Sequence, residues 1–154
     1  MPPLGNNIDF SNDVEFSKLL LRSDDVDLAT ASLELARDSD PQLNFAQTLG
    51  WIDQCVEELS GPIARAKSEQ DMLEALAACL SGTHGLTGSA EAYQSPDGSY
   101  LPDVIRTGHG IPISLSVIYI AVAERLQIPL RGVAAPAHFL CRLDAPGGPL
   151  FLDA

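Results

Sequence analysis

The most constraining feature of the sequence is the segment GIPISLSVIYIAVAERL, residues 110–126, which is apolar on nearly every side if it is helical. Pro112 suits the first position of a helix, because the N–H group that proline lacks has no helical partner there. A helix over 112–126 exposes charge only near its end, at Glu124 and Arg125. Such a helix is buried on most sides, so the rest of the chain must pack around it.

The length and composition are those of one soluble globular domain. The chain has 154 residues, of which 45% are hydrophobic and 19% are charged. That composition excludes a disordered chain, and a membrane-spanning helix would need an apolar run of about 18 residues, which the sequence lacks. The opening sequence also has no basic and apolar signal peptide, so we expect a cytoplasmic protein.

The acidic charge is concentrated in the first two thirds of the chain. The net charge is −12, and residues 1–99 hold 17 acidic residues against 5 lysines and arginines, while residues 100–154 hold 4 of each kind. Nucleic acids and anionic lipids bind basic surfaces. We therefore expect neither a nucleic-acid partner nor a membrane partner.

The first half of the sequence predicts helices. Residues 1–24 are polar, and we expect an irregular or flexible N-terminus with at most a short helix around 14–21. Apolar residues recur at helical spacing over 28–37 and 42–59, and Ser68 is a suitable N-cap for a third helix that runs to Gly82. A single domain is thus predicted over 25–154, with its helical part at 25–82.

The second half predicts loops, one buried helix and strands. Residues 83–99 are rich in Gly and Ser and predict an ordered loop, and the core helix and strands follow over 100–154, beginning with a short helical turn at 100–105. Strand patterns cover 130–134, 137–143 and 150–153, and the last two form a hairpin. Helices followed by antiparallel strands give an α+β fold.

Alternation along the middle strand assigns its side chains to two faces. His138 shares one face with Leu140 and Arg142, and the residues between them point to the other face. Phe139, Cys141 and Leu143 are therefore expected on the face opposite His138.

The order of these parts resembles a known family. The stretches GIPISLSVIYIAVAERL and PAHFLCRL, with a final strand ending in Asp, are similar to the transglutaminase-like branch of the papain-type fold. More narrowly, residues 99–153 resemble the N-terminal domain of the bacterial SirB-type family of proposed invasion regulators. The helices from residue 27 onward also resemble the opening of that family.

The resemblance implies a site made of a nucleophile, a base and an orienting acid. In active transglutaminase-like enzymes a Cys at the helix N-terminus attacks an acyl group, a His takes its proton and an Asp orients the His. By this resemblance His138 is the base and Asp153 the orienting residue. The Cys position falls on Pro112, which has no nucleophilic atom.

Two serines follow Pro112, and their role has two interpretations. Ser114 lies about 200° around the helix from Pro112, and Ser116 is one turn further on, on the same side as Pro112. Ser114 is the nucleophile of a hydrolase or acyl transferase acting on amides or esters if it meets His138 and Asp153. Otherwise both serines serve helix packing. The expected binding cleft is lined by His109, Gly110, Pro112, Ser116 and Pro136.

The cysteines and remaining histidines do not have the spacing of a metal site. Cys55, Cys79 and Cys141 are far apart in sequence, and buried free thiols are the expected result. His84 and His109 lie in two Gly-rich loops. We therefore predict no metal and no cofactor.

The preferred hypothesis is a transglutaminase-like domain without the usual Cys, which acts as a protein- or peptide-binding regulatory module. Family members usually continue beyond this point, often into helical repeats, so the resemblance leaves two alternatives: the chain is a fragment truncated at its C-terminus, or it is a product that lacks those repeats. Gln127 stands where the related pattern has Gly after the helix. If its backbone is left-handed, it costs about 1 kcal/mol.

Overall fold

The computed structural model describes residues 12–154, and its helices pack around one central helix. The first eleven residues of the expected irregular N-terminus lie outside the described part. No helix among the described residues is both long and apolar enough to cross a membrane. The helices are α1 Val14–Leu20, α2 Leu28–Arg37, α3 Phe45–Arg65, α4 Glu69–Ala77, the π-helical turn η1 Ala78–Thr83, the 3₁₀ turns η2 Ala90–Tyr93 and η3 Pro96–Gly98, α5 Leu101–Thr107 and α6 Pro112–Arg125.

The strands form two separate sheets. The larger is antiparallel in the order β3-β4-β5 and consists of β3 Arg131–Ala135, β4 His138–Ala145 and β5 Gly148–Leu152. The smaller is a parallel pair of β1 Thr87–Gly88 with β2 His109–Gly110. This small pair ties the loop of residues 83–99 to the segment that leads into α6. The α+β prediction and the predicted hairpin are confirmed.

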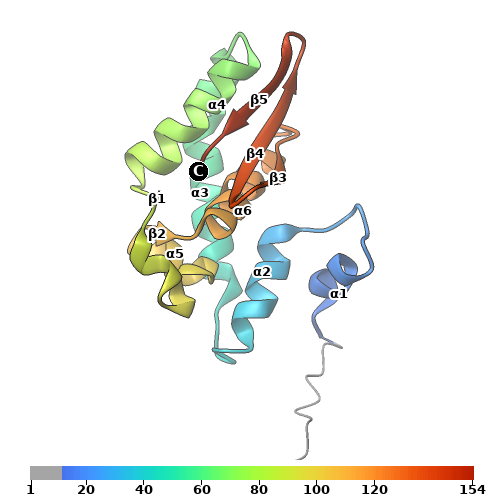
Figure 1. The fold of residues 1–154 in the computed structure, drawn as a ribbon, viewed down its shortest axis with the longest axis vertical. Helices are drawn as coiled ribbons and strands as arrows, with labels where there is room; N and C mark the ends of the chain where they lie inside the picture. The colour runs from blue at the N-terminus through green and yellow to red at the C-terminus, as the bar shows by residue number, and fades with distance from the viewer. Residues whose placement is uncertain (1–11) are drawn as a thin grey trace, which may run out of the picture.

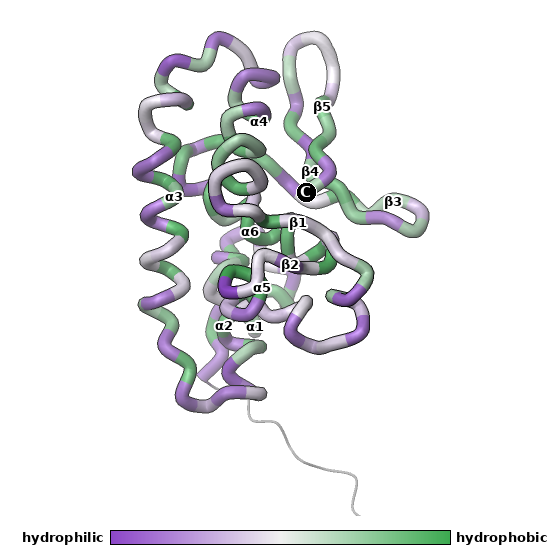
Figure 2. The backbone as a smooth tube through the Cα atoms, turned by 90° about the vertical axis from the view of Figure 1, so that its left-hand side faces the viewer, coloured by the Kyte–Doolittle hydropathy of each residue, from purple (hydrophilic) through white to green (hydrophobic). Residues whose placement is uncertain are grey.

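Helix α6 is the centre of the structure, as its composition requires. It packs against α2, α3, α5 and β4, and nine of its residues, including both serines, are buried. Figure 2 shows hydrophobic residues along much of α6, whereas α3 at the side of the molecule alternates between hydrophilic and hydrophobic residues. The all-round apolar character of α6 therefore reflects burial on several sides.

The structure confirms the predicted starts of two helices and changes two of the predicted ends. Ser68 caps α4 by accepting a hydrogen bond from the N–H group of Asp71, and α6 begins at Pro112. The helix predicted over 42–59 begins at Phe45 and continues to Arg65, although Pro62 in its last turn cannot donate a backbone hydrogen bond to the helix. The helix predicted to reach Gly82 is α-helical only to Ala77, and it widens there into the π-helical turn η1.

The sheet covers α6 with one face and leaves the other face exposed. Cys141 and Leu143 are buried beneath the sheet, and Leu150 and Leu152 of β5 pack on the same core. Figure 1 shows β5 beside α4 near one end of the molecule and the α1–α2 pair at the other end. The opposite, outer face of the sheet carries His138, Leu140 and Arg142 of β4 with Phe151 of β5, as strand alternation predicts.

Candidate functional site

The start of α6 is positioned by two glycines. Gly108 has left-handed backbone, with φ of 78°, and ends α5. Gly110 is closely surrounded: a Cβ atom added there would lie 2.9 Å from both Ser114 Oγ and Val104 Cγ1. Ile111 is extended, and Pro112 is the first helical residue. Glycine is therefore required at this corner for its backbone freedom and its small size.

Ser114 lies inside the fold and uses its hydroxyl group there. The side chain is 4% exposed, and its Oγ donates to the backbone oxygen of Gly98 at 2.6 Å and lies 3.0 Å from that of Ile111. Gly98 also accepts a hydrogen bond from the Ile111 N–H group. The hydroxyl of Ser114 thus links the start of α6 to η3 through a hydrogen bond.

Ser116 is fully buried, and its hydroxyl has no hydrogen-bond partner among the described residues. Its backbone oxygen lies 3.9 Å from Cys141 Sγ, so β4 crosses α6 close to this residue. A small side chain permits that close approach.

His138 and Asp153 form the expected pair. His138 Nε2 lies 2.9 Å from Asp153 Oδ2, and the two side chains are 39% and 63% exposed. His138 is the first residue of β4 and Asp153 follows the last residue of β5. The pair lies on the outer face of the sheet and is accessible from solvent.

No hydrogen bond joins Ser114 to this pair within the described part of the chain. Ser114 and Phe139 line one groove, and Phe139 points to the opposite side of β4 from its neighbour His138. The strand therefore separates the serine from the imidazole. The structure brings His138 and Asp153 together and leaves Ser114 apart from them.

The other predicted cleft residues do not gather at one place. His109 lines a small pocket of ≈ 280 Å³ next to η2 and η3. Gly110 and Ser116 are buried, whereas Pro136 is exposed in the turn between β3 and β4. Sequence position alone does not show which side of α6 or of the sheet each residue occupies.

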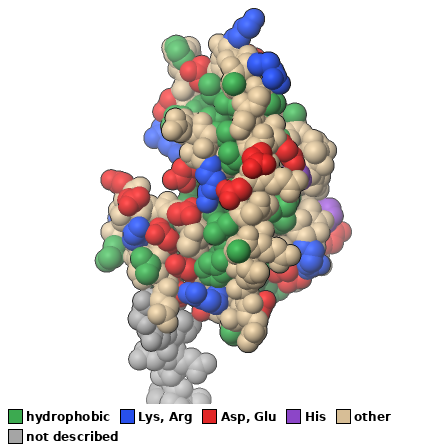
Figure 3. All heavy atoms as spheres, turned by 180° about the vertical axis from the view of Figure 1, so that it is seen from behind, with side chains coloured by type: hydrophobic (Ala, Val, Ile, Leu, Met, Phe, Trp, Pro, Cys, Tyr) green, Lys and Arg blue, Asp and Glu red, His purple; other side chains and the backbone are tan. Residues whose placement is uncertain are grey.

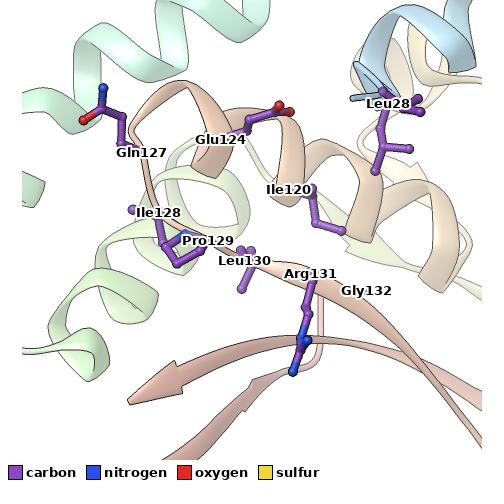
Figure 4. A pocket seen from close by; sticks show the side chains of 10 residues that line it. Leu28, Ile120, Glu124, Gln127, Ile128, Pro129, Leu130, Arg131 and Gly132 are labelled. Atoms are coloured by element: carbon purple, nitrogen blue, oxygen red, sulfur yellow. The ribbon is translucent and has the colours of Figure 1, made fainter. Parts of the chain in front are cut away.

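A groove that the sequence did not indicate runs between α2, α6 and the sheet. One part, of ≈ 470 Å³, is lined mainly by apolar side chains of α1, α2, α6 and β4. A second part, of ≈ 490 Å³, shares Leu28, Ile120 and Gly132 with the first and continues toward the end of α6. Figure 4 shows Leu28 and Ile120 at this second part, with residues 127–130 along its wall. We call the two parts together the α2–α6 groove.

Charged groups are mixed over the surface. On the face shown in Figure 3, acidic and apolar side chains separate most of the lysines and arginines from one another. On that face Lys and Arg side chains do not form the continuous basic surface that nucleic acids bind.

None of the three thiols is poised as a nucleophile. Burial raises the pKa of Cys55 to about 12 and that of Cys79 to about 11, and it also raises the pKa of Cys141. A reactive Cys needs a lowered pKa and access to solvent.

Cys55 and Cys79 lie close together with His84: their Sγ atoms and a ring nitrogen of His84 all lie within 4.8 Å of one another. Sequence spacing had given no sign of this cluster.

The chain is similar to proteins of one bacterial family. Residues 46–154 match the family model described as the transglutaminase-like superfamily. A UPF0162 protein of Xylella fastidiosa is 38% identical over 128 residues, which is 82% of this chain and 45% of that protein. The UPF0162 protein YchA of Escherichia coli K12 is 30% identical over 103 residues, covering 62% of this chain and 38% of the relative.

Protein SirB1 of Salmonella typhimurium is 29% identical over 101 residues, which is 66% of this chain and 38% of SirB1. The chain thus spans less than half the length of these curated relatives. No solved structure is significantly similar to it.

Proposed function

Since the chain belongs to the transglutaminase-like superfamily and is related to the UPF0162 and SirB1 proteins, we propose that it is a non-catalytic member that binds an apolar peptide segment of a partner protein. The proposed absence of catalysis rests on one observation. The first residue of α6 is Pro112, and the nearest hydroxyl, on Ser114, is buried and bonded to backbone oxygens. In this proposal the chain has the papain-type arrangement of helix and sheet but lacks the nucleophile.

The α2–α6 groove supports the binding part of the proposal. Its walls are mostly aliphatic, and three apolar side chains at its margin are substantially exposed: Leu19, Leu35 and Ile113. Pockets lined in this way favour apolar ligands, because binding removes both surfaces from water.

The neighbouring sheet edge supports an extended form of the peptide. Among the described residues β3 pairs only with β4, so it lies at an edge of the sheet. Gly132 of β3 lines both parts of the groove. A peptide strand added to β3 gains main-chain hydrogen bonds and directs alternate side chains into the groove.

A displayed library of extended peptides tests this proposal on the whole chain. We expect selected apolar peptides to bind the wild-type protein, and Ile113→Asp and Leu35→Glu to weaken binding by at least about tenfold, since each places a charge in an apolar wall. Tyr93→Asp is the control: Tyr93 is also a large exposed hydrophobic side chain but lies outside the groove. Equal loss in all three variants, or no selected peptide, contradicts the proposal.

The alternative is a hydrolase or acyl transferase that uses Ser114, His138 and Asp153. The observation that favours it is the His138–Asp153 contact of 2.9 Å. Intact-mass measurement after treatment with a fluorophosphonate decides between the two functions. Stoichiometric labelling of Ser114 that is lost in His138→Ala supports the enzyme, and the absence of His138-dependent labelling supports the binding module.

A further inference from the structure

We propose that Cys55, Cys79, His84 and Glu58 bind one Zn²⁺ ion at the junction of α3 and the π-helical turn η1. This site is separate from the α2–α6 groove and does not depend on the proposed function. It differs from the expectation drawn from the sequence, where the donors are too far apart to suggest a metal site.

The donor atoms are already close together. The two Sγ atoms and a ring nitrogen of His84 lie within 4.8 Å of one another. Glu58 Oε2 lies 2.7 Å from His84 Nε2 and 3.6 Å from Cys79 Sγ, so a fourth donor adjoins two of the three. Bonds of about 2.0–2.3 Å place the ligand atoms of a tetrahedral zinc site about 3.3–3.8 Å apart. Small side-chain movements therefore complete the coordination.

Two neighbouring elements hold the donors in place. Cys55 and Glu58 are one turn apart on α3, which makes them neighbours on one helix face. Cys79 is in η1 and His84 follows it, and the N–H group of His84 donates to the backbone oxygen of Cys79 at 3.0 Å. This hydrogen bond, between residues five apart in sequence, widens the helix and brings the side chains of Cys79 and His84 to α3. Such π-helical turns often occur at functional sites.

Trp51 of α3 orients the imidazole. Its ring meets the ring of His84 edge to face, with the centroids 5.2 Å apart. Such contacts fix the plane of a histidine and leave its nitrogen atoms available to a ligand. The His84 side chain is 16% exposed, and a pocket of ≈ 220 Å³ lined by Glu58 and Cys79 adjoins the cluster. An ion therefore has a path to the donors.

The donor chemistry selects the metal. Two sulfur donors with one imidazole and one carboxylate suit zinc, because hard ions such as Mg²⁺ and Ca²⁺ prefer oxygen ligands. Binding replaces the S–H proton of each thiol by a Zn–S bond, and the two protons pass to the solvent. The two thiolates and the Glu58 carboxylate together leave the occupied site with one net negative charge, and His84 and Glu58 lie on its partly exposed side.

Titration of the reduced whole chain with Zn²⁺, and with Co²⁺ as a spectroscopic probe, tests the site. We expect one ion per chain by native mass spectrometry and a thiolate-to-cobalt charge-transfer band. Cys79→Ser and His84→Ala should each weaken Zn²⁺ binding by at least about 100-fold, the upper range for loss of an outer-shell partner. Cys141→Ser is the matched control, because Cys141 is equally buried and outside the cluster, and should bind zinc as the wild type does.

His84→Ala keeps the test valid if Cys79→Ser does not fold, since His84 is not fully buried. Absence of stoichiometric zinc in the reduced wild type overturns the proposal, and so does equal binding by His84→Ala. A Cys55–Cys79 disulfide in a protein that binds no zinc after reduction also overturns it, and identifies a redox pair instead.

Discussion

At the scale of single residues, Gln127 occupies a position that favours glycine. Its φ is 61°, and the bonds from Gln127 N–H to Glu124 and from Ile128 N–H to Ala123 form the pattern that ends helices with a left-handed residue. Gln127→Gly should raise the free energy of unfolding by about 0.5–1 kcal/mol, because glycine adopts this backbone without strain. Urea unfolding measures the change. Gln127→Ala keeps the Cβ atom and should give no gain; an equal gain would refute the backbone argument.

The two buried serines of α6 should respond in opposite directions to loss of the hydroxyl group. Ser114→Ala removes the donor to Gly98, and we expect a loss of about 1 kcal/mol of stability. Ser116→Ala removes a buried hydroxyl that has no partner in the described part of the chain, so stability should stay unchanged or rise by up to about 1 kcal/mol. Thermal or urea unfolding of both variants provides the comparison. A larger loss in Ser116→Ala would mean that its hydroxyl has a partner.

At the scale of elements, polar contacts join α1 to α2, among them those of Glu34 and the Arg37–Asp13 ion pair, and α1 has no buried residue. Glu34 is buried and accepts hydrogen bonds from the N–H groups of Glu15 and Phe16, in the first turn of α1. Such an acceptor also interacts favourably with the positive end of the helix dipole.

Glu34→Ala should therefore release α1 while the core stays folded. We expect faster amide exchange over residues 14–20 and a loss of about 1.5–3 kcal/mol, the usual value of hydrogen bonds to a charged group. Glu57→Ala, an exposed glutamate on α3, is the matched control. Unchanged exchange in α1 would show that other contacts hold it.

The elements that the sequence predicts well are those defined by local signals. Ser68 and Pro112 mark helix starts through their own chemistry, and alternation along β4 assigns its faces correctly. The β1–β2 pair, the α2–α6 groove and the approach of Cys55 to Cys79 depend on contacts between distant segments. No periodicity within a short window reports such contacts, so neither the cysteine cluster nor the groove could be predicted from the sequence.

At the scale of the whole molecule, the hydrophobic core contains none of residues 12–24. The large buried cluster has no member from α1 and begins, in chain order, at Ala29. Several apolar side chains near α1 are instead exposed, among them Val14, Leu20 and Leu21. This distribution agrees with the predicted domain boundary at residue 25, which remains a prediction.

Deletion of residues 1–24 should therefore leave a cooperatively folding domain. The urea m-value should change little, because it scales with the surface exposed on unfolding and α1 buries little of it. The peptide affinity of the α2–α6 groove should fall, since the deletion removes Leu19 from its margin. Urea unfolding followed by tryptophan fluorescence at Trp51 tests the first expectation, and peptide titration tests the second. A broad transition with a much smaller m-value would instead place residues 12–24 within the cooperative core.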